Sequence, residues 1–213
     1  MHDGTQGSLL VLAADDVEDA ILLARVGDTD ELIALLQRHS SRSLLTGATM
    51  GDLVRQIQDP ETGNTLLHYA SANGHSSLIK RLVELLLQQK AEGREQEVVA
   101  LAYLLRANKS GNTALHWASL NGQLEVVRIL IDTIEGLASQ TEGNKQGIAV
   151  SKQDEDGEEE DEAKRRSIWD VVNAAGRGPM SEAQMNNQEE VVRFLLDRMI
   201  AATASSPTAE QDT

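Results

Sequence analysis

Residues 111–122, GNTALHWASLNG, repeat an earlier stretch of the chain, residues 63–74, which reads GNTLLHYASANG. An apolar stretch follows each copy at the same offset of 48 residues: LIKRLVE at 78–84 and VVRILID at 126–132. Recurrence at a fixed spacing is typical of solenoid folds, because one unit alone cannot bury its apolar face and neighbouring units must share a core. These copies therefore predict a stack of repeated units rather than a single closed core.

Two weaker copies extend the pattern in both directions along the chain. Residues 190–197, EVVRFLLD, match the second half of the third unit at an offset of 65. We align residues 167–172, SIWDVV, with the first half of that unit at an offset of 54, which places Trp169 at a core leucine position. The two offsets differ, so we expect an insertion at 178–186. A degenerate copy occupies residues 19–36.

Each unit has the pattern of a helix, a turn and a second helix. Apolar residues in the second half of each unit recur at helical spacing. An Asn-Gly pair at 73–74, and again at 121–122, is expected to end the first helix, because glycine adopts the left-handed conformation without a steric clash. Thr65 and Thr113 precede the first helix, where an N-cap hydroxyl can accept from free backbone amides.

These residues resemble the ankyrin repeat. Residues 65–70, TLLHYA, and 113–118, TALHWA, follow the Thr-Pro-Leu-His-x-Ala pattern of that family, with the proline replaced. The resemblance implies an all-α fold, an ankyrin-repeat solenoid of about four helix-turn-helix units. We expect an N-terminal segment at 1–14, one repeat domain at 15–200 and a flexible tail at 201–213. The units are expected at about 15–40, 59–90, 107–135 and 163–200.

The steps between units are longer than the ankyrin period of about 33 residues, so inserted residues must lie between the helix pairs. One insertion spans Gln89–Arg106, and we expect it to lengthen a helix, since residues 98–105 are apolar and lack glycine. The other spans about 139–163 and contains residues 154–162, DEDGEEEDE. A block so rich in carboxylates cannot pack into a core, so the sequence predicts a disordered acidic insertion.

The acidic insertion has two interpretations, and both stay open. In the first it is only a solvated linker. In the second it is a flexible polyanion that docks on a lysine- and arginine-rich protein, raises the association rate and screens the partner's basic surface. The predicted partner contacts in this stretch are Asp154, Glu155, Asp156, Glu158, Glu159, Glu160, Asp161 and Glu162.

Composition excludes several function classes. The chain has a formal net charge of −15, five aromatic residues and no cysteine, which rules out disulfide scaffolds and thiolate zinc sites. Acidity and scarce aromatics argue against direct nucleic-acid binding. No apolar run reaches the roughly 18 residues that span a bilayer, so we expect no membrane partner. Residues 9–14, LLVLAA, lack a basic residue before them and make a poor signal peptide, so we expect a cytoplasmic and nuclear protein.

No residue pattern predicts catalysis. The sequence contains no His-Glu-x-x-His, no Gly-x-Ser-x-Gly and no phosphate-binding glycine motif. The ankyrin resemblance implies that His68 and His116 tie each loop to the next by hydrogen bonds, and His75 is expected to be structural as well. We therefore predict a protein that is not an enzyme, with no catalytic residues, no cofactor, no metal site and no small-molecule substrate.

Ankyrin stacks bind partners through their loop tips and the concave face of the first helices. Carried onto the matching positions of this chain, the family pattern implies contacts in the second and third units, although these positions are also compatible with ordinary surface turns. The predicted contact residues are Glu61, Thr62, Asn64, Ala72 and Asn73 in the second unit and Lys109, Ser110, Asn112, Leu120 and Asn121 in the third.

A narrower resemblance points to fungal ankyrin-repeat chaperones dedicated to small-subunit ribosomal protein S-three. It rests on the Trp-Ala-Ser-Leu-Asn-Gly variant at 117–122, four units, wide spacing and strong acidity. Here the acidic tract lies between units three and four rather than after the last repeat. The resemblance implies a dedicated chaperone that binds a basic client one-to-one and shields it before assembly into pre-ribosomes. A generic ankyrin adaptor in signalling or transcription is the alternative function.

Overall fold

The computed structural model describes residues 12–42, 48–88, 95–142 and 171–204. These residues form ten α-helices and no β-strand, so the predicted all-α class is confirmed for the part of the chain that is described. The helices are α1 (Ala14–Val26), α2 (Thr29–Arg42), α3 (Met50–Gln56), α4 (Leu66–Ala72), α5 (Ser76–Leu87), α6 (Glu95–Leu104), α7 (Ala114–Leu120), α8 (Leu124–Glu142), α9 (Pro179–Met185) and α10 (Glu189–Ala204).

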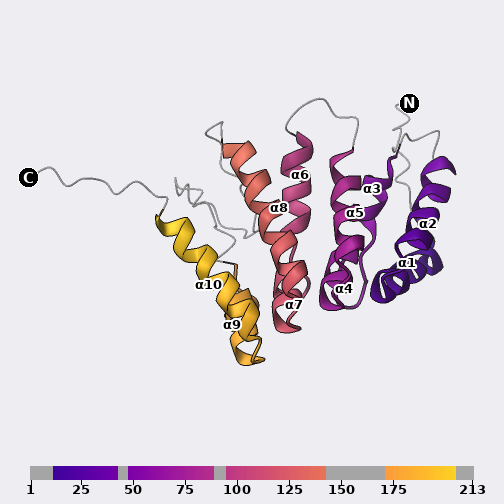
Figure 1. The fold of residues 1–213 in the computed structure, drawn as a ribbon. Coiled ribbons are helices and arrows are strands. Elements are labelled where there is room, and N and C mark those ends of the chain that lie inside the picture. Colours follow the sequence, from indigo (N-terminus) through magenta and orange to yellow (C-terminus); the bar gives the residue numbers. More distant parts are fainter. Residues whose placement is uncertain (1–11, 43–47, 89–94, 143–170, 205–213) are drawn as a thin grey trace, which may run out of the picture.

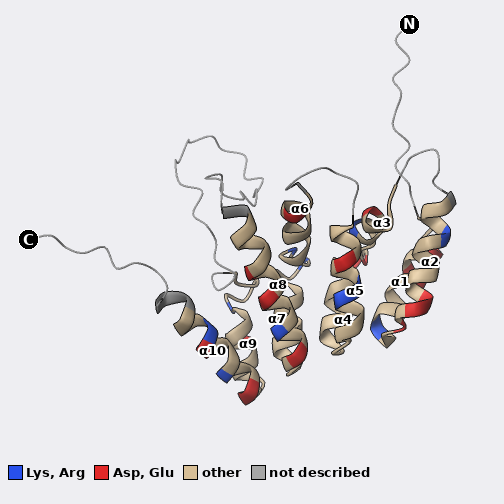
Figure 2. Cartoon of the chain, turned by 45° about the horizontal axis from the view of Figure 1, so that its top comes forward, with Lys and Arg blue, Asp and Glu red and all other residues tan. Residues whose placement is uncertain are grey.

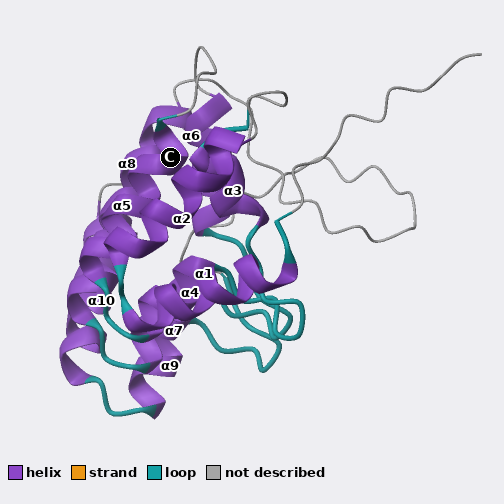
Figure 3. Cartoon of the chain, turned by 90° about the vertical axis from the view of Figure 1, so that its right-hand side faces the viewer, coloured by secondary structure: helices purple, strands orange, loops and turns teal. Residues whose placement is uncertain are grey.

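The helices stand in two rows that together form a curved solenoid (Figure 1). The inner row contains α1, α4, α7 and α9, and each of these helices packs against the next. The outer row contains α2, α5, α8 and α10, and Figure 3 shows the two rows side by side. Buried leucine, isoleucine, valine and alanine side chains form one continuous core between the rows. The repeats thus share a core with their neighbours, as a solenoid requires.

Two additional helices explain the long step between repeats. Helix α3 lies between α2 and α5, and α6 lies between α5 and α8 (Figure 1). The prediction that residues 89–106 lengthen a helix is wrong, because α5 ends at Leu87 and α6 is a separate helix. α6 buries Ala100 and Leu101, and the Tyr103 hydroxyl donates to the Val54 carbonyl of α3 over 3.0 Å. Packing between outer helices, rather than helix extension, therefore accommodates these residues.

The predicted alignment of the fourth repeat is wrong. The stretch 178–186, expected to be an insertion, contains the inner helix α9. The loop before α9 repeats the loop before α7 at a constant offset of 65: Asn173 donates its backbone N–H to the Arg177 carbonyl as Asn108 donates to that of Asn112. Alignment failed here because Gly178 replaces the N-cap threonine, so the Thr-x-Leu-His signature is lost. Trp169, predicted to be buried, lies outside the described residues.

The inner helices end where the Asn-Gly pairs predict. Gly74 and Gly122 have φ of 78° and 71°, the left-handed conformation that terminates α4 and α7. In the fourth repeat Asn187 takes this position with φ 57°, and asparagine tolerates the left-handed region better than most residues do.

Helix α8 continues to Glu142, past residue 139 where the acidic insertion was expected to begin. The tract at 154–162 itself lies outside the described residues, so its predicted disorder stays a prediction.

Candidate functional site

The loops that lead into the inner helices stack on one another through their backbones. The Lys109 amide donates to the Thr62 carbonyl and the Ala174 amide donates to the Ser110 carbonyl, each over 3.0 Å. The stacking leaves little room: a Cβ on Gly111 would lie 2.8 Å from the Ala174 nitrogen. Successive loop tips therefore form one continuous edge of the molecule.

Histidine side chains reinforce this stack, as predicted. His68 Nδ1 accepts from the Thr65 backbone N–H at 3.1 Å, so Nε2 carries the proton and donates to the Asn112 carbonyl of the next loop at 2.9 Å. His116 repeats the arrangement and donates to the Arg177 carbonyl at 3.1 Å. Burial lowers the pKa of His68 to about 4, so the ring is neutral at physiological pH. This assignment follows from the hydrogen-bond partners and fits a structural role.

Asparagine side chains add a second ladder between loops. The Asn108 side-chain amide donates to Asn64 Oδ1 at 2.7 Å, and that of Asn173 donates to Asn112 Oδ1 at 2.8 Å. Asn64 is only 6% exposed. Its side chain therefore joins neighbouring repeats, and little of it is available to a partner, although it was among the predicted contacts.

A second seam joins the far ends of the inner helices. His75 Nε2 donates to the Arg25 carbonyl at 2.8 Å, as the structural role predicted for His75 requires. At the matching position of the fourth repeat, Gln188 Nε2 donates to the Leu120 carbonyl at 3.2 Å. Helices α7 and α9 are thus tied at both ends, α4 and α7 at the loop end, and α1 and α4 at the far end, which holds the inner surface as a fixed scaffold.

The structure brings most of the predicted contact residues onto this inner surface. Thr62 and Tyr69 connect loop tip to helix, because their hydroxyl oxygens lie 3.4 Å apart. The exposed members of the predicted set are Glu61, Thr62, Asn73, Lys109, Ser110 and Asn121, and the partly exposed members are Ala72, Asn112 and Leu120. We define this set, without Asn64, as the inner contact surface. Whether these residues touch a partner stays a prediction.

Sequence reasoning missed three exposed apolar residues on the inner helices: Leu22, Val26 and Met185. Val26 precedes the left-handed Gly27 as Asn73 precedes Gly74, and Met185 matches Leu120 at the offset of 65. The register error in the fourth repeat concealed Met185, and the offset of 65 would have revealed it. All three extend the inner contact surface toward both ends of the stack.

Charges on the described helices are mixed, and Figure 2 shows acidic and basic residues on several helices of both rows. At the inner surface the Tyr69 hydroxyl donates to Asp59, and this hydrogen bond lowers the pKa of Asp59 to about 2. The Arg25 guanidinium lies 4.3 Å from the centre of the Tyr69 ring. These contacts link α1, α4 and the loop before α4.

The family model for ankyrin repeats, in three copies, matches residues 20–140. The chain is a member of the ankyrin-repeat family. Matching chains occur among solved structures, and one belongs to the crystal structure of the yeast ribosomal protein Rps3 in complex with its chaperone Yar1. That match has a TM-score of 0.59 and 28% sequence identity and covers 88% of this chain and 95% of the other. No curated protein sequence matches. The ankyrin fold and this neighbour are typical of binding proteins rather than enzymes.

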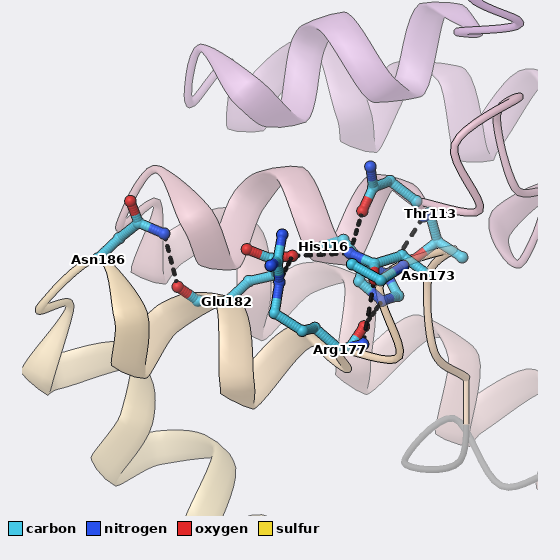
Figure 4. Close-up of polar contacts among 8 residues, drawn as sticks. Thr113, His116, Asn173, Arg177, Glu182 and Asn186 are labelled. Atoms are coloured by element: carbon cyan, nitrogen blue, oxygen red, sulfur yellow. Dashed lines mark hydrogen bonds and ion pairs between the residues drawn. The ribbon is translucent and has the colours of Figure 1, made fainter.

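The fourth ankyrin repeat departs from the pattern of the others at Glu182, which replaces Tyr69 and Trp117 of the preceding repeats. Its carboxylate is buried, with the residue 3% exposed, and accepts from Arg177 Nε at 2.8 Å and Asn173 Nδ2 at 2.7 Å (Figure 4). Burial by itself would raise the pKa of Glu182, but these two hydrogen bonds and the Arg177 charge outweigh it and lower the pKa. Glu182 therefore stays ionised and fixes the last loop of the stack.

The described parts of this ankyrin-repeat protein contain no group of three or more potential ligand side chains that could hold a metal ion. Among the same residues, no helix is both long and apolar enough to cross a bilayer.

Proposed function

We propose that this ankyrin-repeat protein is a dedicated chaperone that binds a basic ribosomal protein of the Rps3 type and shields it before assembly into pre-ribosomes. The observation that carries the proposal is the match to the Rps3–Yar1 complex at 28% identity over 88% of the chain. At this identity the match extends over the whole repeat stack rather than one consensus unit. The expected client is bound one-to-one, in the cytoplasm and nucleus.

The inner contact surface suits a client segment with an apolar side. Leu22, Val26 and Met185 are exposed along it, next to polar loop tips such as Lys109 and Ser110. An amphipathic helix placed in a groove buries such residues and leaves its polar side in water. In this proposal the rigid scaffold holds one segment of the client.

The charge of the chain suits the rest of such a client. A free ribosomal protein is basic because it contacts rRNA, and the net charge of −15 here attracts it and screens it from other polyanions. Eight acidic residues lie in the tract at 154–162. Release then follows from competition with rRNA, whose charge density is higher.

The direct test is binding to purified yeast Rps3, measured by calorimetry in 100 and 400 mM salt, with the wild-type chain and with residues 154–162 deleted. We expect a one-to-one complex, weaker by at least tenfold at high salt, because exposed charges are screened beyond roughly 8 Å at physiological ionic strength. The deletion should weaken binding and reduce the salt dependence without changing the melting temperature. Absence of Rps3 binding at low salt would refute the proposal.

A matched pair of charge variants locates the client. Ser110→Lys places one cation on an exposed loop tip and should weaken Rps3 binding at least fivefold by repulsion of a basic client. Ala102→Lys adds a cation on the exposed side of α6 and should leave binding within twofold.

The alternative is a generic adaptor in signalling or transcription, which uses the same groove for a client of any charge. It predicts affinity that hardly changes with salt and no response to the deletion.

A further inference from the structure

The end of the stack carries a largely apolar hollow between α10 and the start of α9. Its volume is about 180 Å³, and its lining includes Val172, Pro179, Met180 and Met199. Val172 is 55% exposed, and both methionines are partly exposed. We call this feature the α10 hollow. It is an unusual surface for the end of a repeat array, because terminal repeats normally present a polar outer face.

The matching positions of the third repeat are buried. The loops before α7 and α9 correspond at a constant offset of 65. At that offset Met180 matches Leu115 and Met199 matches Ile134, which are 4% and 2% exposed. The two positions are therefore covered inside the stack and open at its end, so an apolar group is expected to cover them there as well.

The size and lining of the α10 hollow suit one aromatic ring. An apolar cavity of roughly 150 Å³ takes up a benzene ring, and methionine sulfur makes favourable contacts with aromatic side chains. The chain has five aromatic residues, and the described structure places four of them elsewhere: Tyr69, Tyr103, Trp117 and Phe194. The fifth is Trp169, which lies just outside the described residues.

Trp169 is within reach of the α10 hollow. It precedes Val172, which lines the hollow, by three residues, and three residues of chain span at most about 10 Å. At the offset of 65, Trp169 matches Leu104 of α6, which is 1% exposed. The chain thus carries its one unplaced aromatic residue at a position that the third repeat buries.

The correspondence with α6 is limited to its C-terminal end. At the same offset, Arg165 and Arg166 replace Ala100 and Leu101, both of which α6 buries. Burying two unpaired guanidinium groups in these places is strongly unfavourable. The comparison therefore extends to Trp169 and not to a whole helix. The residues after α10 offer no substitute, because 205–213, SPTAEQDT preceded by Ser205, contain no aromatic residue, leucine, isoleucine, valine or methionine.

We propose that the indole ring of Trp169 occupies the α10 hollow, in contact with Met180 and Met199, and closes the end of the solenoid. The chain then caps its own last repeat, and the α10 hollow is not open to a partner. This goes beyond the proposed function, because it involves neither Rps3 nor the inner contact surface.

The first test uses the full chain with ¹³C-labelled methionine methyl groups, at micromolar concentration. We expect nuclear Overhauser effects between the Trp169 ring and the methyl groups of Met180 and Met199. An aromatic ring shifts the resonances of groups that touch it, so Trp169→Leu should move both methyl signals. The signals of Met50 on α3 and Met185 at the end of α9 should stay in place, because neither residue lines the hollow.

The second test measures how accessible the ring is. In the Trp117→Phe chain Trp169 is the sole tryptophan, and acrylamide should quench its fluorescence at least threefold less than in the urea-unfolded chain. Met199→Glu puts a carboxylate in the hollow and should increase quenching at least twofold. Ile200→Glu is the matched control, since Ile200 is exposed and does not line the hollow, and it should leave quenching unchanged. Melting curves confirm that each variant folds.

Three results would overturn the proposal. They are methyl signals of Met180 and Met199 that do not respond to Trp169→Leu, quenching of Trp169 that is as strong in the folded chain as in urea, and Overhauser effects that join a labelled copy to an unlabelled one. The last result would assign the ring to a second copy of the chain. Failure of Rps3 binding, by contrast, affects only the proposed function, because neither test contains Rps3.

Discussion

The His68 imidazole donates from Nε2 to the backbone carbonyl of Asn112, 2.9 Å away in the following repeat. Because Nδ1 accepts from Thr65 within its own repeat, one buried ring satisfies a helix N-terminus and a neighbouring loop together. His116 and Arg177 repeat this relationship one unit later. The stability of the stack therefore depends on a few side chains that bridge repeats.

Removing the ring should destabilise the stack. His68→Ala leaves the buried Thr65 amide without its partner and removes one of the two donors to the Asn112 carbonyl, so we expect a loss of about 1–3 kcal/mol in the free energy of unfolding. Urea denaturation followed by circular dichroism measures it. The control is His75→Ala at the more exposed seam, which should cost less than about 1 kcal/mol. Equal losses in both variants would contradict the bridging role.

The same ring should make stability depend on pH. Its pKa is about 4 when folded and near 6.5 when unfolded, so the unfolded chain binds the proton more readily. The stabilisation of the folded chain that this pKa difference represents is complete above pH 6.5 and is lost as the pH falls toward 4. It amounts to about 3 kcal/mol. Unfolding free energies of wild type and His68→Gln, measured from pH 7.5 to 4, should converge on acidification. Parallel curves would show that His68 does not titrate in this way.

Glycine-to-alanine substitutions should change the free energy of unfolding in opposite directions at different positions of the chain. Gly111→Ala combines φ 76° with a Cβ 2.8 Å from the Ala174 nitrogen, so we expect a loss above about 2 kcal/mol. Gly176→Ala has φ 71° but open space around the Cβ and should cost about 1 kcal/mol.

Gly136→Ala supplies the matched control within α8. Nothing lies within 4 Å of the added Cβ, and alanine favours the helix, so we expect a gain of about 0.5–1 kcal/mol. Thermal melts rank the three variants by melting temperature. A lower melting temperature for Gly136→Ala would contradict the free space around residue 136.

The pair Glu182–Arg177 should show strong coupling. Glu182→Ala removes the acceptor for both Arg177 and Asn173, and we expect a loss of about 1–3 kcal/mol, since Arg177 is partly exposed and keeps some solvation. A double-mutant cycle with Arg177→Ala, read by urea unfolding, should give an interaction energy of at least about 0.5 kcal/mol. Additive losses would mean that the two side chains act independently.

The surface residues of the candidate site were only partly predictable. The Thr-x-Leu-His signature placed Glu61, Asn73 and Asn121 by family position, and the structure exposes them. It also placed Asn64 there, but that side chain accepts from Asn108, 44 residues away, and no local pattern contains such a contact. Met185 was missed because Gly178 and Ser181 remove the signature from the fourth repeat.

The sequence by itself determined the repeated helix-turn-helix units, the helix ends at Gly74 and Gly122 and the bridging histidines, because these depend on interactions within a few residues or on one recurring motif. Tertiary structure decided whether the residues before Asn108 lengthen α5 or form α6, since the choice depends on the space between α5 and α8. It also decided the register of the fourth repeat and the exposure of Leu196. Burial is a property of neighbours in space, and a helix leaves the same apolar stripe in its sequence whether or not another helix covers it.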